Sequence, residues 1–180
     1  MSDFDSGESA PLIHLMHYDP RWRQEFQQTR SGVLQSCMGW VTSVEHIGST
    51  AISGLIARPI IDVLAGVEDR EGLDESANMI EGLNYRRLAT VDESAWPSDG
   101  IVLIKPRFGS PTHRVVLTEV NSPVWRSAIA IRDWLRSHPE VAIDFEQAKV
   151  DMWKQTEGDP NAYAAGKASF FDQLKRRIDA

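Results

Sequence analysis

Residues 46–67 read HIGSTAISGLIARPIIDVLAGV, and this stretch decides the fold. Its last part, residues 60–67, is almost wholly apolar apart from Asp62, which is typical of a central strand covered on both faces. Residues 40–47 are rich in β-branched side chains that alternate with Ser43 and Glu45, so they predict a strand before it. The small residues Gly48, Ser49 and Thr50 begin the loop between these two strands.

The rest of the chain adds helices around these strands. Apolar residues at helical spacing predict helices over residues 20–38, 69–83, 123–137, 141–152 and 160–178. Short strands are expected near residues 85–88 and over 101–105 and 113–120, the last two as a hairpin, after an acidic irregular stretch at 90–100. This order predicts an α/β (α+β) fold, with a mixed β-sheet flanked by helices and a helical C-terminal part. Residues 1–17 are expected to form a flexible tail, and residues 18–180 a single domain.

The composition limits the classes of protein. The chain has 180 residues and a net charge of −7, from 26 acidic and 19 basic side chains, which argues against binding to long nucleic acids. No apolar run approaches the roughly 18 residues of a membrane span, and the acidic N-terminal stretch resembles neither a signal nor a transit peptide. Cys37, the single cysteine, is expected in the core. We therefore expect a soluble, cytoplasmic protein.

Asp62 is the residue that most needs a chemical explanation. A carboxylate inside an apolar strand costs several kcal/mol to desolvate unless it meets a cation, a metal ion or several donors. It either pairs with Arg58 or caps neighbouring backbone, or it is a ligand of a hard cation such as Mg²⁺. Gly48, Ser49 and Thr50 form either an ordinary loop or one that receives a phosphate on backbone N–H groups and hydroxyls.

Several segments together resemble the GrpB family of small bacterial proteins. They are residues 18–22, the whole of 46–67, 122–126, 132–135, 138–140 and the closing Tyr163, Lys167 and Phe170. That family belongs to the nucleotidyltransferase superfamily and is sometimes fused to dephospho-CoA kinase. The resemblance implies a nucleotidyltransferase-like sheet in which Gly48 and Ser49 hold nucleotide phosphates. It also implies that Asp62 is both a catalytic and a metal-binding residue, with Mg²⁺ as the cofactor and an NTP as the substrate.

Two strands depart from what the resemblance implies. Leu64 stands where the superfamily has its second metal-binding carboxylate, two residues after Asp62. The family pattern Thr-His-His-Leu-His-Val corresponds here to residues 112–117, which read THRVVL. His113 keeps the first histidine and is our second catalytic candidate, whereas Arg114 and Val116 turn the other strand face cationic and apolar.

Other candidates complete the expected ligand site. Lys105, Arg107 and Arg114 surround the hairpin and are expected either to converge on an anionic ligand or to form a solvated surface. Arg58 places a cation beside the loop, and Lys167 on an apolar helix stripe reaches either an internal carboxylate or a ligand phosphate. His46 orients the loop, acts as an acid or base, or is purely structural.

These residues leave two main functions open. The first is an enzyme that transfers a nucleotidyl or phosphoryl group from an NTP to an unknown acceptor. The second is a catalytically altered protein of the same fold that binds an anionic small molecule or metabolite without NTP chemistry. A protein-interaction module that uses the acidic tail and residues 90–100 is a third reading. The sequence names neither the substrate nor the oligomeric state.

Overall fold

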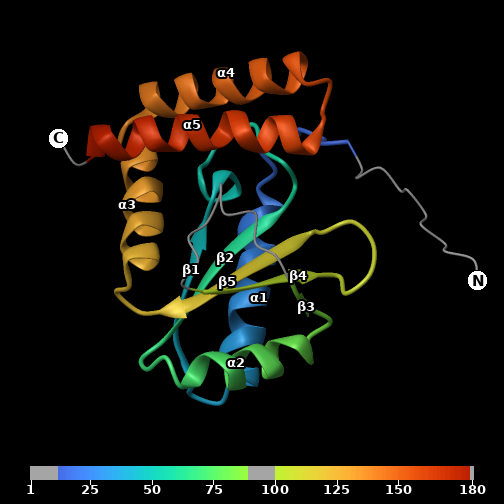
Figure 1. Ribbon diagram of the computed structural model, residues 1–180, viewed down its shortest axis with the longest axis vertical. Coiled ribbons are helices and arrows are strands. Elements are labelled where there is room, and N and C mark those ends of the chain that lie inside the picture. Colours follow the sequence, from blue (N-terminus) through green and yellow to red (C-terminus); the bar gives the residue numbers. More distant parts are fainter. Residues whose placement is uncertain (1–11, 89–99, 179–180) are drawn as a thin grey trace, which may run out of the picture.

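The computed structural model describes residues 12–88 and 100–178. Figure 1 shows a sheet flanked by helices, with two of the C-terminal helices lying across one end of it. In chain order the elements are α1 (Arg21–Ser36), β1 (Val41–Ile47), η1 (Ser49–Ala51), β2 (Ile61–Val67), α2 (Gly72–Glu81), β3 (Arg86–Arg87), β4 (Ile101–Lys105), β5 (His113–Glu119), α3 (Pro123–Ser137), α4 (Pro139–Gln155) and α5 (Pro160–Ile178).

The five strands form one mixed sheet in the order β1-β2-β5-β4-β3. The β1–β2, β5–β4 and β4–β3 pairs are antiparallel, and β2 and β5 run parallel. All seven residues of β2 are buried, as its apolar sequence predicts. The predicted α/β fold with a mixed sheet, and the hairpin of β4 and β5, are therefore confirmed.

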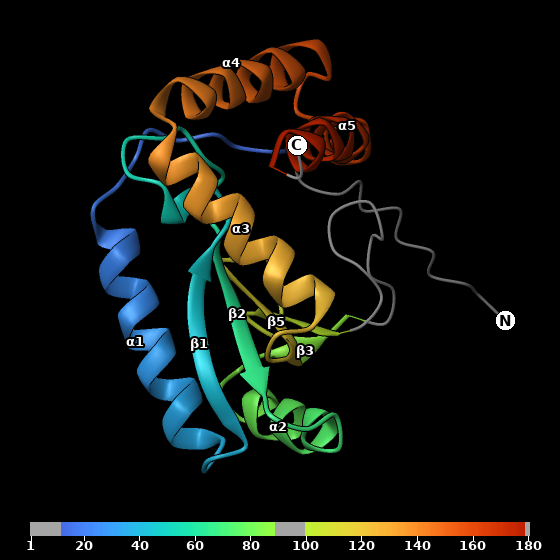
Figure 2. The ribbon, with the colours of Figure 1, turned by 90° about the vertical axis from the view of Figure 1, so that its left-hand side faces the viewer.

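Helices cover both faces of the sheet, and Figure 2 shows α1 and α3 on opposite sides of it. Side chains alternate along β2, so that Val63 and Ala65 join a core with α1 and α2. Leu64 faces the other way, into a smaller core with Val116 of β5 and Trp125 of α3. Asp62 and Arg114 share the parity of Leu64 and Val116, so both belong to the α3 face.

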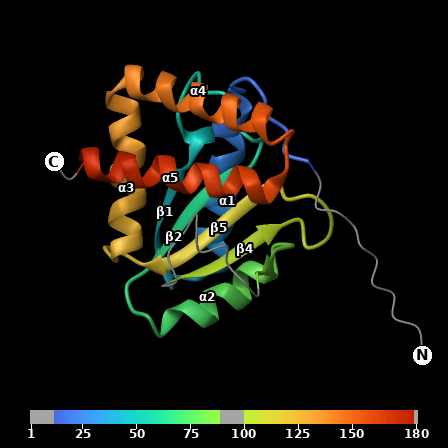
Figure 3. The ribbon, with the colours of Figure 1, turned by 45° about the horizontal axis from the view of Figure 1, so that its top comes forward.

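The C-terminal helices form a third core, above the end of the sheet where β2 begins. Figure 3 shows α3, α4 and α5 gathered there. Leu135, Phe145 and Leu174, one from each helix, pack with Ile52 and Leu55 of the loop between β1 and β2. This loop is thus held between the sheet and the helices.

Local signals in the sequence set several helix ends. Ser122 caps α3, since its hydroxyl accepts a hydrogen bond from the backbone N–H of Trp125 at 3.2 Å. Asp159 does the same for α5 by accepting from the N–H of Ala162 at 2.8 Å. Helix α2 is shorter than expected, because Asp69 forms a turn before it by accepting from the N–H of Glu71. Of the acidic stretch at 90–100, all but Gly100 lies outside the described residues.

Two further expectations concern the N-terminal stretch and the cysteine. Residues 12–17 do not form a tail: the backbone of Met16 pairs with that of Ala57, and the N–H of Ile13 donates to Gly158 at 2.9 Å. The expected boundary at residue 18 therefore moves toward the N-terminus, while residues 1–11 lie outside the described part. Cys37 is fully buried in the core, as expected, and burial raises the pKa of its thiol to about 11.

Candidate functional site

The end of β1 and the start of β2 bring Gly48 against Asp62. Ile47 pairs with Asp62 across the two strands, so the next residue, Gly48, turns directly beside the carboxylate. Gly48 has φ 72° and ψ −173°, a conformation restricted to glycine. A Cβ at this position would lie 2.5 Å from Oδ2 of Asp62. The space left by the missing side chain therefore receives the Asp62 carboxylate.

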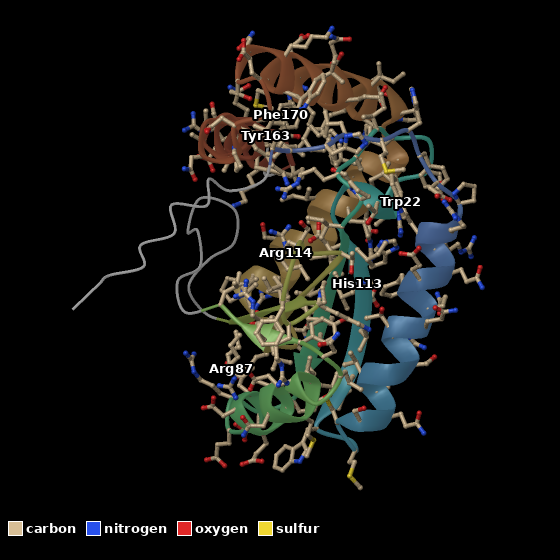
Figure 4. The ribbon with its side chains drawn as sticks, turned by 90° about the vertical axis from the view of Figure 1, so that its right-hand side faces the viewer. Trp22, Arg87, His113, Arg114, Tyr163 and Phe170 are labelled. Atoms are coloured by element: carbon tan, nitrogen blue, oxygen red, sulfur yellow. The ribbon has the colours of Figure 1, made fainter. Side chains whose placement is uncertain are left out.

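Arg114 supplies the partner that the buried carboxylate requires. It lies directly opposite Asp62 on the neighbouring strand β5, and its Nε donates to Oδ1 of Asp62 at 2.7 Å. Both side chains are largely buried, with 23% and 10% of their surface exposed. Figure 4 shows Arg114 at the end of the sheet, below Tyr163 of α5. The partner of Asp62 is thus Arg114 rather than Arg58.

A small cavity of about 30 Å³ lies over this ion pair, and we call it the Asp62 cavity. Its volume matches the share of one water molecule in the liquid. Its walls come from the loop, from β2 and β5, and from helices α4 and α5. They are Ser49, Thr50, Arg58, Ile60, Asp62, Arg114, Lys149, Tyr163 and Lys167. The structure therefore brings together Asp62, Ser49, Thr50, Arg58, Arg114 and Lys167 of the predicted residues.

Four cations surround the single carboxylate of this cavity, and their titration reflects the crowding. Burial lowers the pKa of Lys167 to about 8, with Arg114 and Arg58 lowering it and Asp62 raising it. Burial likewise lowers the pKa of Lys149 to about 7, and the nearby Lys167 adds to that effect. Partial burial lowers the pKa of Arg58, and Arg114 lowers it further. The cavity has an excess of positive charge that an anion would relieve.

His46 holds the loop and does not enter the Asp62 cavity. Its ring stacks on Phe26 of α1, with 4.6 Å between the centroids, and Nε2 lies 3.0 Å from the hydroxyl of Thr50. That hydroxyl donates to the carbonyl of Ile60, so His46 donates from Nε2. Burial lowers the pKa of His46 to about 4, the nearby arginines Arg136 and Arg132 lower it too, and Asp62 opposes them. The ring is neutral at pH 7 and orients the loop.

Helices α3 and α4 hold the same loop by its backbone. Arg136 donates to the carbonyl of Ala51 from both Nε and Nη2, at 3.2 and 3.0 Å. On α4, Glu146 accepts from the N–H of Ile56 at 2.6 Å, and Lys149 donates to the carbonyl of the same residue. The C-terminal helices therefore fix the position of the loop that carries Ser49 and Thr50.

Three predicted residues lie away from Asp62, namely Lys105, Arg107 and His113. Lys105 and Arg107 therefore do not converge with Arg114, which corrects that expectation. His113 and Lys105 line a separate cavity of about 250 Å³ on the α1 face, because strand residues of odd and even number point to opposite faces. Figure 4 shows His113 on the side of α1. Arg107 caps α2, since it donates to the carbonyls of Glu81 at 2.7 Å and Tyr85 at 3.3 Å.

Comparison with known proteins identifies the family. A family profile described as GrpB protein matches residues 12–177. The chain belongs to the GrpB family. It is 28% identical to the glutamate-rich protein GrpB of Alkalihalophilus pseudofirmus, with 93% of this chain and 97% of that protein aligned. The crystal structure of a conserved GrpB protein from Enterococcus faecalis has the same fold, with a TM-score of 0.79 at 26% identity, and the match covers 92% of this chain and 96% of that one.

Some of the matched proteins are much longer than this chain. The chain is 26% identical to a protein named dephospho-CoA kinase from Mycobacterium bovis, but it spans only 44% of that protein, with 87% of this chain aligned. Within the described part of this GrpB chain, no helix has the length and apolar character that crossing a membrane requires.

The donors around Asp62 do not fit a magnesium ion in this GrpB protein. Mg²⁺ prefers carboxylate oxygens in an octahedral arrangement. Here Oδ1 of Asp62 accepts from Arg114, and Oδ2 packs over Gly48. Among residues 12–88 and 100–178, no group of three or more His, Cys, Asp or Glu side chains lies close enough to hold a metal ion. The donors of the described residues therefore do not favour the metal role expected for Asp62.

Sequence reasoning missed three residues of the site, Lys149, Tyr163 and Arg136. Lys149 lies four positions after Phe145 and is only 2% exposed, so a lysine on an apolar helix stripe was the available signal, as it was for Lys167. Tyr163 was named only as part of the family resemblance, without a role in the site. No pattern in the GrpB sequence indicates that Arg136 binds the carbonyl of Ala51.

Proposed function

We propose that this GrpB protein binds the phosphate group of an anionic small molecule in the Asp62 cavity, with its own cations in place of a metal ion. The observation that supports this most directly is the ratio of charges: Arg58, Arg114, Lys149 and Lys167 line the cavity with one carboxylate, which Arg114 already engages. Guanidinium groups donate to phosphate oxygens in pairs, and ammonium groups add point charges.

The small volume of the cavity defines how the ligand enters. A space of about 30 Å³ admits part of a phosphate group, so the exposed side chain of Arg58 moves outward as the ligand binds. The rest of the molecule then lies outside. Binding would raise the pKa values of Lys149 and Lys167 again, because a nearby negative charge favours their protonated forms.

The test is calorimetric titration of the full chain with ATP, ADP and inorganic phosphate, in EDTA and in excess Mg²⁺. Binding should persist in EDTA. Arg58→Gln removes one charge-assisted contact worth about 1.5–3 kcal/mol, which is about 10- to 100-fold in affinity. Arg107→Gln is the matched control, since it removes the same charge from a residue outside the cavity.

Two outcomes would overturn the proposal. If Arg58→Gln bound ATP, ADP and phosphate as tightly as the wild type does, the ligand would not bind in the Asp62 cavity. Binding that requires Mg²⁺, with turnover of the NTP, would instead favour the nucleotidyl-transfer function that the family resemblance implies.

A further inference from the structure

A much larger cleft lies beside the outer edge of β1, between α1, α3 and the beginning of α4. Its volume is about 860 Å³, within the range of roughly 300–1,000 Å³ that holds small-molecule ligands. Figure 2 shows α1 and α3 on the two sides of β1, which is an edge strand of the sheet. The cleft shares Thr50 with the Asp62 cavity, but neither Asp62 nor any of the four cations around it lines the cleft.

Four arginines enter this cleft from two helices, and we call it the arginine cleft. Arg23 and Arg30 come from α1, and Arg132 and Arg136 come from α3. Burial lowers the pKa of Arg136, and the nearby guanidinium groups of Arg132 and Arg23 lower it as well. The arginines of the two helices therefore face one another closely enough to interact.

The acidic side chains of the cleft are already engaged. Glu45 accepts from Arg132 at 2.6 Å, and Arg132 also donates to Asp133 at 2.8 Å. Glu146 accepts the N–H of Ile56. Arg23 and Arg30, by contrast, form no ion pair within the described part of the chain. Two arginines at the cleft are thus available to an external anion.

Part of the remaining wall is apolar. Leu135 and Ala142 lie in the wall, and Ile143 of α4 keeps 66% of its surface exposed. An exposed isoleucine next to a charged cleft offers a surface for the apolar part of a ligand. The neutral ring of His46, stacked on Phe26, adds no charge to this wall. The chemistry fits a molecule that has an anionic end and an apolar or aromatic body.

We propose that the arginine cleft is a second ligand site, which binds a phosphate-bearing small molecule of about the size of a nucleotide. The phosphate lies against Arg23 and Arg30, and the body of the molecule lies over Leu135 and Ile143. This site is distinct from the Asp62 cavity, because it uses different cations, although both sites include Thr50.

The experiment is calorimetric titration of the full chain with ADP, in EDTA. The wild type should bind ADP at the cleft, and the double variant Arg23→Gln/Arg30→Gln should lose at least tenfold in affinity there. Both residues are exposed on α1, so the variant should melt near the wild-type temperature in a circular dichroism scan. Arg70→Gln/Arg86→Gln is the matched control, since it removes the same charge from exposed positions outside both cavities.

The outcomes separate the two sites. Loss of an ADP binding event in Arg23→Gln/Arg30→Gln, with no such loss in the control, supports the arginine cleft. This holds whether or not Arg58→Gln also weakens the binding of ADP. Equal ADP binding by the double variant and the control overturns it, even if Arg58→Gln still abolishes binding at the Asp62 cavity. Inorganic pyrophosphate, which lacks an apolar body, should bind the cleft more weakly than ADP, and equal affinity would contradict the role of Leu135 and Ile143.

Discussion

Replacing Gly48 by alanine tests the packing at the centre of the candidate site. The new Cβ would lie 2.5 Å from Oδ2 and 3.0 Å from Cβ of Asp62, a residue that Arg114 holds in place. The glycine-only backbone conformation costs about 1–3 kcal/mol in other residues. Forcing a methyl group into filled space costs about 1–3 kcal/mol more. We therefore expect Gly48→Ala to lower the free energy of unfolding by about 4 kcal/mol.

The assay is urea unfolding followed by circular dichroism, with thermal melts alongside. For a chain of this size 4 kcal/mol corresponds to a fall in Tm of about 8–16 °C. Gly54→Ala is the matched control: Gly54 also has a positive φ, 82°, but a Cβ there meets nothing within 4 Å. Gly54→Ala should lower the free energy of unfolding only by the cost of the backbone conformation, about 2 kcal/mol. Equal destabilisation by the two variants would refute the packing of Asp62 against Gly48.

Three other substitutions test single contacts. Burial and Lys167 lower the pKa of Lys149 from 10.5 to about 7, so between these pH values the unfolded chain binds the extra proton. The stability of the wild type relative to Lys149→Met should therefore rise by about 3–4 kcal/mol between pH 7 and pH 10 in urea unfolding, and a difference constant with pH would contradict this. Arg107→Ala should cost about 2 kcal/mol by exposing the end of α2, yet leave phosphate affinity unchanged in calorimetry. Ser122→Ala should cost about 1 kcal/mol in the same unfolding assay, through the lost cap of α3.

The fold was largely predictable because its signals are local. The apolar run of residues 60–67 predicts a buried strand, which the structure confirms. The helices expected to begin at residues 123 and 160 also begin there, behind the caps Ser122 and Asp159. Helix ends were less certain, as at Asp69, because a turn and a first helical residue use the same capping side chains. The pairing of Met16 with Ala57 joins distant segments, so no local pattern indicated it.

The candidate site was predictable only in part, because its geometry depends on strand neighbours. The alternation of side chains along a strand correctly places Arg114 and His113 on opposite faces of the sheet. It does not indicate which residue of a neighbouring strand lies beside Arg114. That depends on the parallel register of β2 and β5, which long-range packing sets. Lys105 and Arg107 follow the same hairpin as Arg114, and proximity in sequence therefore suggested a convergence that the sheet prevents.

The two departures from the superfamily pattern have one physical explanation in the structure. A second carboxylate at position 64 would face the same side as Asp62, and two neighbouring buried carboxylates require an external cation. With Leu64 there, Asp62 is a single buried charge, and Arg114 from the adjacent strand balances it within the chain. The three remaining cations then have no carboxylate of their own among the residues that line the cavity; they are Arg58, Lys149 and Lys167. A chain with a net charge of −7 thus gathers positive charge at the Asp62 cavity, which supports the proposed binding of an anion there.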